Sequence, residues 1–177
     1  MKLPAFTDEE VLIPCDKAFI HGSLVIPRNP IGLIIFAHGS GSSRFSPRNN
    51  FVARFLNQGG LATLLLDLLL PSEDQDLENR FNIQLLSFRL AATVSWAKKA
   101  ESTKNLPLGL FGASTGAAAA LQYLGDITNE DSSDIFAVVS RGGRPDLADS
   151  SALEQVKAPT LLIVGQDDEP VIAYNQM

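Results

Sequence analysis

The chain has 177 residues, enough for one domain with a core, and its 45% of hydrophobic residues against 19% of charged ones excludes wholesale disorder. Its formal net charge of −6 gives it no overall attraction to nucleic acid or to anionic lipid, so neither is an expected partner. Cys15 is the single cysteine, and the sequence has two histidines. An intrachain disulfide is therefore excluded, and we expect neither a metal nor another cofactor.

Neither the first ten residues nor the most apolar segment has the pattern of an export signal or a membrane helix. The sequence begins M-K-L-P-A-F-T-D-E-E, with Pro4 and then acidic residues where a signal peptide needs an apolar stretch. The most apolar segment, 61–70, is interrupted by Asp67 and is far shorter than the ~20 residues that a membrane helix requires. We therefore expect a soluble, cytoplasmic protein.

The first half of the chain alternates short apolar runs with turns and one helix. In order, we expect lead-in strands at 11–13 and 18–26, a buried strand at 32–37, a helix from Pro47 to Gly59, and a buried strand at 61–66. The strand at 32–37 reads G-L-I-I-F-A, and its lack of polar alternation predicts burial on both faces. The helix is expected to carry Phe51, Phe55 and Leu56 on one face.

The second half continues the alternation. In order, we expect a helix at 78–100, a strand at 106–111, a helix at 115–124, a strand at 135–139, a buried strand at 158–164, and a helix from Val171. Phe81, Leu85, Phe88 and Ala92 have the spacing of an apolar helix stripe, and we expect Phe88 in the core. The pattern predicts an α/β fold with a mostly parallel central sheet flanked by helices, as a single domain over 1–177.

A candidate nucleophile stands between a predicted strand and a predicted helix. F-G-A-S-T-G at 111–116 contains G-x-S-x-G, with Ser114 at its centre. In a strand-to-helix elbow, such a serine lies on a strained turn, and the flanking glycines relieve crowding. The alternative is an ordinary helix N-cap serine. We favour the nucleophile, because small residues at 117–120 allow the helix to pack closely on the sheet.

A nucleophilic serine needs hydrogen-bond donors for the oxyanion. In this architecture one donor is the backbone N–H after the nucleophile, here Thr115, and the other comes from the loop after an earlier strand. That loop reads H-G-S-G at 38–41, and we select Ser40 for the second N–H, with Gly39 as the next choice. His38 precedes the serine in the chain, so we expect it to organise the loop by hydrogen bonding rather than act as a base.

The third expected member is an acid at the end of a later parallel strand. The loop 165–169 (G-Q-D-D-E) follows the predicted strand 158–164 and contains Asp168, our first choice, and Asp167. Asp67 and Asp146 also follow strands and remain weaker alternatives. A polar loop that caps the following helix is the plain alternative for the whole cluster.

Four arginines lie in loops after predicted strands. Arg44, Arg48, Arg141 and Arg144 fall at the carboxyl edge of the sheet, where ligands bind in open α/β folds. We therefore treat them as candidates for holding an anionic substrate.

Four blocks of sequence together resemble the α/β-hydrolase superfamily, and within it the dienelactone-hydrolase-like proteins. They are H-G-S-G-S-S-R-F-S-P-R-N at 38–49, F-G-A-S-T-G-A-A-A-A at 111–120, S-R-G-G-R-P-D-L-A at 140–148, and A-P-T-L-L-I-V-G-Q-D-D-E-P-V-I at 158–172. The combination is also similar to the hydrolase domain fused to phosphoribosyltransferases in some bacteria. The resemblance implies a serine-type hydrolase of small ester or lactone substrates, with a phosphoribosyltransferase as a possible fusion partner.

One member of the family's pattern has no counterpart here. The superfamily's catalytic histidine follows the acid, beyond one more helix and strand, and neither His21 nor His38 occupies that position. We therefore expect a hydrolase domain incomplete at its C-terminus, without the last strand and helix, with negligible esterase activity and a tendency to aggregate. The alternative function is an inactive remnant or partner-binding module. A cofactor-binding doubly wound domain is disfavoured, because the loop at 38–43 lacks G-x-G-x-x-G spacing.

Overall fold

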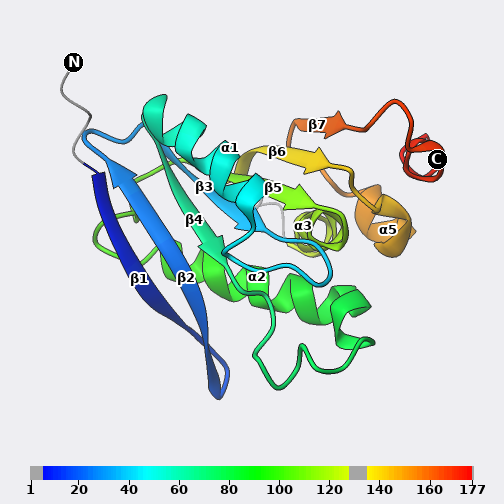
Figure 1. The fold of residues 1–177 in the computed structure, drawn as a ribbon, viewed down its shortest axis with the longest axis horizontal. Coiled ribbons are helices and arrows are strands. Elements are labelled where there is room, and N and C mark those ends of the chain that lie inside the picture. The colour runs from blue at the N-terminus through cyan, green and yellow to red at the C-terminus, as the bar shows by residue number, and fades with distance from the viewer. Residues whose placement is uncertain (1–5, 128–134, 177) are drawn as a thin grey trace.

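A seven-stranded sheet organises the chain (Figure 1). The computed structural model describes residues 6–127 and 135–176, so residues 1–5, on which part of the signal-peptide argument rests, lie outside it. The strands are β1 (Phe6–Cys15), β2 (Ala18–Pro27), β3 (Gly32–Ala37), β4 (Leu61–Leu66), β5 (Leu108–Ala113), β6 (Ile135–Arg141) and β7 (Thr160–Ile163). Their order across the sheet is β1-β2-β4-β3-β5-β6-β7. The β1–β2 and β2–β4 pairs are antiparallel and the others parallel, which confirms the predicted fold class.

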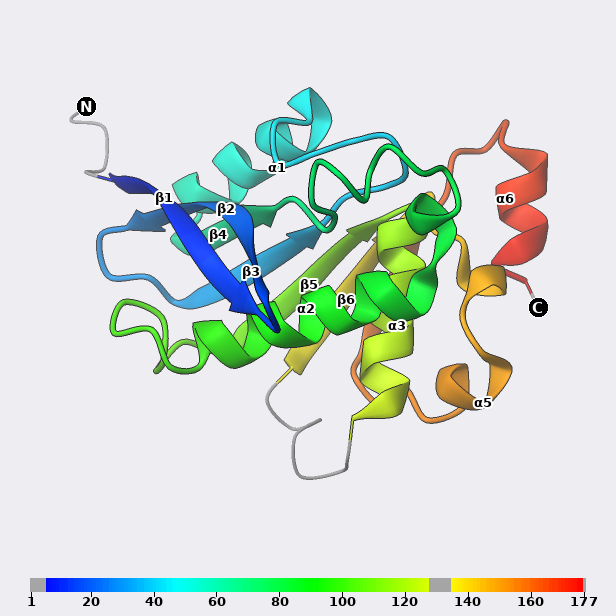
Figure 2. The same cartoon turned by 90° about the horizontal axis from the view of Figure 1, so that it is seen from below.

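Helices cover both faces of the sheet. The long helices are α1 (Pro47–Gln58), α2 (Ile83–Ala97) and α3 (Thr115–Asp126), and the short ones are η1 (Asn79–Phe81), η2 (Pro145–Leu147), α5 (Ser150–Leu153) and α6 (Glu169–Tyr174). Figures 1 and 2 show α1 on one face of the sheet and α2 with α3 on the other. Within the described ranges, no helix has both the length and the apolar character needed to cross a bilayer.

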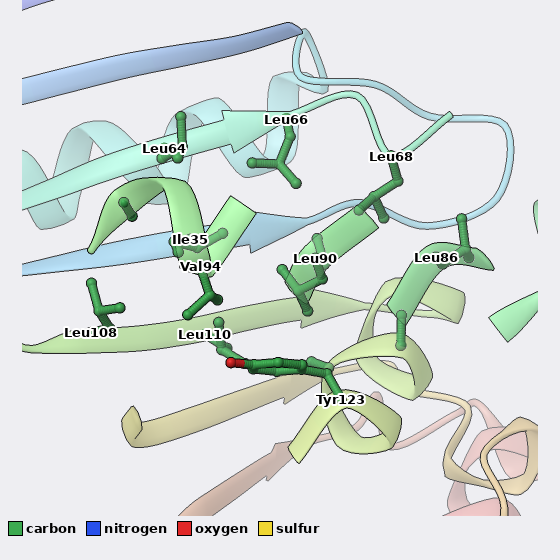
Figure 3. Close-up of a cluster of buried hydrophobic side chains, with 14 of the residues drawn as sticks. Ile35, Leu64, Leu66, Leu68, Leu86, Leu90, Val94, Leu108, Leu110 and Tyr123 are labelled. Atoms are coloured by element: carbon green, nitrogen blue, oxygen red, sulfur yellow. The ribbon is translucent and has the colours of Figure 1, made fainter. Parts of the chain in front are cut away.

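The core divides into two clusters, one on each face of the sheet. The larger one joins β3, β4 and β5 to α2 and α3, with Leu64 of β4 and Leu90 and Val94 of α2 among its buried members (Figure 3). The smaller one lies under α1 and contains Phe36 and Phe111, whose ring centroids are 4.8 Å apart. The central strands β3 and β5 are therefore covered on both sides, as their unbroken apolar sequences predict.

The expected apolar face of α1 is confirmed for Leu56 and wrong for the two aromatic residues. Leu56 is partly buried and packs against the smaller cluster, whereas Phe51 and Phe55 are 62% and 68% exposed. The fully buried positions are Asn49, Ala53 and Asn57. The small side chain of Ala53 allows close packing on the sheet. The side-chain amide of Asn57 donates to the Leu61 carbonyl and to the Thr63 hydroxyl, so polar bonds rather than aromatic burial set the rotation of this helix.

The helix expected at 78–100 is shorter, and its apolar stripe is confirmed only in part. Leu85 is partly buried and packs against the larger cluster, whereas Phe81 and Phe88 are exposed, at 51% and 52%. The helix proper begins after Asn82, whose side chain accepts the Leu85 N–H as an N-cap. The apolar residues that α2 buries are Ile83, Leu86, Leu90, Val94 and Ala97.

The strand expected at 158–164 is present as the shorter β7, but it is exposed rather than buried. All four of its residues are exposed, and among the described strands it pairs only with β6. Phe136, on the neighbouring β6, is 64% exposed. The described sheet therefore ends in an open edge with apolar side chains on it.

The parallel strands bring the candidate residues to one edge of the sheet. β3, β5, β6 and β7 all run in the same direction, so the segments that follow them begin at the same edge. These segments contain His38, Ser114, Gly142 and Asp168, respectively. The topology thus creates the carboxyl-end crevice in which open α/β folds bind their ligands.

Candidate active site

Ser114 has a backbone conformation that few non-glycine residues adopt. It connects β5 to α3 with φ 51° and ψ −120°. Such a conformation is strained and persists when the surroundings hold it. Here the Ser114 N–H donates to the Arg141 carbonyl at 3.3 Å, and its own carbonyl accepts the N–H groups of Ala117 at 3.1 Å and Arg144 at 3.3 Å. The elbow is therefore fixed by β6, by the segment after β6 and by α3.

The two glycines of the motif are required by close backbone approach. A Cβ on Gly112 would lie 2.4 Å from the Cα of Ala117, so only glycine lets the first turn of α3 lie on the end of β5. A Cβ on Gly116 would lie 2.2 Å from the Ala37 carbonyl oxygen and 2.4 Å from that of His38. Both positions thus hold the helix start against the ends of the central strands.

His38 organises the loop after β3 with both ring nitrogens. Its Nδ1–H donates to the Gly39 carbonyl at 2.9 Å, and its Nε2 accepts the Leu68 N–H at 3.0 Å. The ring is buried, and that burial lowers its pKa, although the Gly39 carbonyl and the charge of Asp67 oppose the effect. The imidazole is therefore neutral and engaged, as expected for a structural histidine.

The loop that follows His38 lies directly against Ser114. The Gly39 carbonyl also accepts the Ser42 N–H at 3.1 Å, and Gly41 has φ +67°, which together define a tight turn. A Cβ on Gly39 would lie 3.0 Å from the Ser114 Cβ. The backbone of this turn is thus within contact distance of the serine.

Ser40 and Thr115, the two residues selected for the oxyanion, line one small cavity of about 10 Å³. Thr115 is the first residue of α3, so its N–H has no acceptor within the helix. Arg80 lines the same cavity and holds Asp74 through its Nε at 2.9 Å and one terminal nitrogen at 3.1 Å. We did not select Arg80 from the sequence, because it stands in an acidic loop far from every motif.

Asp168 is the candidate acid that lies in the same pocket as Ser114. The pocket has a volume of about 470 Å³ and is also lined by Gly39, Ser42 and Arg48. Asp168 is the N-cap residue of α6, after β7. Asp167, the second choice, is not among the residues that line this pocket.

The two weaker acid candidates are engaged in ion pairs. Asp67 accepts both the N–H and the guanidinium of Arg44. Asp146 is held by Arg144 through two bonds, at 2.8 Å and 2.7 Å. Each carboxylate is therefore neutralised by one of the four arginines proposed for substrate, and the sequence could not reveal these pairs.

Two of the four arginines, Arg44 and Arg144, form ion pairs with carboxylates, and among the described residues the other two do not. Arg44 also bonds Glu10 at 2.9 Å and stacks over Phe45, whereas Arg144 stacks over the ring of Tyr174. Arg48 and Arg141 make no ion pair with a carboxylate within the described ranges, and both line the Ser114 pocket. Burial and the nearby charge of Arg48 lower the pKa of Arg141.

His21 lines a different pocket from Ser114. It is exposed on β2 and lines a second pocket of about 380 Å³ together with His38, Arg44 and Asp67. Ser114 does not line that pocket. The Ser114 pocket therefore combines a strained serine, an acid and two arginines without an ion pair in the described part of the chain, and neither histidine lines it.

Comparison with solved structures gives a match over nearly the whole chain. A dienelactone hydrolase from Anabaena variabilis is 50% identical, superposes with a TM-score of 0.89, and is matched over 97% of this chain and 79% of its own. An α/β serine hydrolase homologue from Coxiella burnetii is 17% identical, with a TM-score of 0.73 over 97% of this chain and 82% of its own, and supports the fold alone. No family model matches the sequence.

Comparison with curated sequences gives longer relatives. Two Mycobacterium tuberculosis proteins named "Putative phosphoribosyl transferase" are each 49% identical over 173 residues, which is 98% of this chain. The chain spans 38% of the length of these relatives.

The close packing at the elbow predicts that a glycine-to-alanine substitution lowers the stability of the protein at Gly116 but not at a loosely packed glycine. Gly116→Ala places a Cβ against two backbone carbonyls that cannot rotate away, so we expect the free energy of unfolding in urea to fall by about 1–3 kcal/mol. Gly165→Ala is the control, because its Cβ would have its nearest neighbour at 3.8 Å, an ordinary contact. Equal urea midpoints for the two variants would contradict the packing argument.

The buried His38 predicts a pH dependence of stability. Its pKa is lowered on folding, so His38 is neutral in both states at a pH well above 6.5, and the unfolded state takes up a proton first as the pH falls. We expect the free energy of unfolding to decrease from about pH 7.5 to about pH 5.5, and this slope to flatten in His38→Gln. The exposed His21→Gln variant is the control and should keep the slope; a slope unchanged in His38→Gln would refute the assignment.

Proposed function

The chain belongs to the dienelactone-hydrolase-like α/β hydrolases, and on that premise we propose that it is the serine hydrolase domain of an enzyme that cleaves small esters or lactones. The observation that carries the proposal is the strained Ser114, held at φ 51° in a pocket that Asp168 also lines. A serine under backbone strain at a sheet edge, with a carboxylate in the same pocket and the start of a helix next to it, supports a role in acyl transfer once a base is supplied.

In the proposed reaction, the Ser114 hydroxyl oxygen attacks the substrate carbonyl carbon. The negative charge that develops on the carbonyl oxygen is held by the N–H groups of Thr115 and Ser40, aided by the positive end of α3. A base takes the proton of the Ser114 hydroxyl during the attack and gives it to the alcohol oxygen as the ester C–O bond breaks, so that the alcohol leaves and the acyl group remains on Ser114. Attack by water on this acyl-enzyme releases the acid and restores the serine.

The base of this reaction is proposed to come from outside residues 1–177. Asp168 would orient a histidine, but His38 has both nitrogens bonded to backbone groups, and His21 lines a different pocket. Without a base the serine is a weak nucleophile, and loss of one triad member lowers turnover by about 10⁴–10⁶-fold. We therefore expect little esterase activity from residues 1–177 alone.

We also propose which protein accompanies this domain and where it acts. The M. tuberculosis relatives are longer than this chain and carry the name of a phosphoribosyl transferase. Their length and name support a fusion with, or proximity to, a phosphoribosyltransferase. We propose that residues 1–177 are a single hydrolase domain that acts on a small molecule in the cytoplasm.

The assignment of the nucleophile predicts a serine-specific reaction. A fluorophosphonate probe should label Ser114 slowly, and added imidazole should accelerate the labelling, because it replaces the base that the chain does not hold at this position. Ser114→Ala should abolish the labelling. Ser42→Ala is the matched control, since Ser42 lines the same pocket without a proposed role in the reaction. Equal labelling of wild-type protein and Ser114→Ala, detected by mass spectrometry, would end the proposal.

A second candidate function, a partner-binding module, is favoured by the open edge of the sheet. Leu161, Ile163 and Phe136 are exposed on adjacent strands. That function predicts concentration-dependent association, measured by light scattering after size-exclusion chromatography, which Leu161→Lys should weaken. A monomer at every concentration would contradict it.

A further inference from the structure

Arg141 lines the Ser114 pocket and has an unsatisfied buried donor. One terminal nitrogen of its guanidinium donates to the Asn49 side-chain oxygen at 3.2 Å. Its Nε is buried and has no hydrogen-bond partner within the described ranges. A buried donor without a partner is destabilising, which favours a rearrangement of this guanidinium toward an anion bound in the pocket.

Arg48 adds a second positive charge and a backbone donor at the same place. It lies in the first turn of α1, where its N–H has no acceptor within the helix. That turn contains no acidic residue, so the positive end of the helix is not neutralised. The side chain is exposed and lines the Ser114 pocket beside Arg141.

The remaining charges of the pocket leave these two arginines free for a ligand. Arg144 is occupied by Asp146. Asp168 is the one carboxylate among the residues that line the pocket, and it makes no ion pair with either arginine. Two unpaired guanidinium groups against one carboxylate give the pocket a net attraction for anions.

We propose that Arg48 and Arg141 form a phosphate-binding subsite, so that the substrate is an ester or lactone carrying a phosphate group. Three donor groups are available here: the Arg48 guanidinium, the Arg48 N–H at the start of α1, and the Arg141 guanidinium. That set suits the three free oxygens of a tetrahedral phosphate better than the two oxygens of a planar carboxylate. The phosphate group anchors the substrate and is not cleaved. The bond that breaks is the carboxylic ester bond next to Ser114.

Phosphate binding at this subsite does not depend on the proposed hydrolase function. The inferred substrate class, a phosphorylated ester or lactone, does rest on that function. The test therefore uses the Ser114→Ala chain, which cannot hydrolyse, and inorganic phosphate as the probe. We expect saturable binding by isothermal titration calorimetry, weakened at least about tenfold by Arg48→Gln or by Arg141→Gln. Arg54→Gln, an exposed arginine later on α1, should bind within about twofold of the parent. Acetate should bind at least about tenfold more weakly than phosphate.

Three results would overturn the subsite: no saturable phosphate binding, equal weakening by Arg54→Gln, or acetate binding as tight as that of phosphate. The last would replace phosphate by a carboxylate. If Arg141→Gln fails to fold, Arg48→Gln decides, because that side chain is exposed. With imidazole added as the base, phosphate should also raise the KM of Ser114-dependent hydrolysis of a neutral aryl ester without lowering kcat. Phosphate binding without any Ser114-dependent fluorophosphonate labelling in the presence of imidazole would support the phosphate subsite and contradict the hydrolase function.

Discussion

The approach of the first turn of α3 to the ends of β3 and β5 is the constraint on which the site depends. Gly116 lies so close to the carbonyls of Ala37 and His38 that any side chain would collide with them, and Gly112 meets α3 in the same way. Between these two contacts the chain turns at Ser114 with a positive φ, which presents the side chain at the carboxyl edge of the sheet. Backbone packing in the core therefore determines where the hydroxyl of Ser114, the proposed nucleophile, lies.

Most of the described polar groups around this elbow are engaged in hydrogen bonds or ion pairs within the protein, and only a few are left to bind a ligand. His38 ties the loop after β3 to the loop after β4, and Arg44 joins Asp67 to Glu10. Such groups hold loops in place at a site whose backbone is strained. Among the described residues, the groups of this pocket that have no carboxylate or hydrogen-bond partner include the Arg48 side chain and the buried Nε of Arg141. These two arginines support a site that recognises a negative charge on the substrate as well as positioning its carbonyl group.

The sequence predicts best what depends on local chemistry. The apolar run of β3 and the elbow at Ser114 are readable because strand burial and a strained turn each restrict the residues that fit. The rotations of α1 and α2 were not readable, since Phe51 and Phe88 are apolar yet exposed, while Asn57 is buried by its bonds to the next strand. Pairing between distant residues is equally hidden: Arg44 and Asp67 meet only once β3 and β4 lie side by side.

The most direct test of the account is a crystal structure of the protein after reaction of Ser114 with an aryl phosphonate that mimics the tetrahedral intermediate. The account predicts a bond from the Ser114 oxygen to phosphorus, with the phosphonyl oxygen about 3 Å from the N–H groups of both Thr115 and Ser40. Ser114 should keep its positive φ in the adduct. A phosphonyl oxygen turned away from these two N–H groups, or phosphorus attached to another residue, would contradict it.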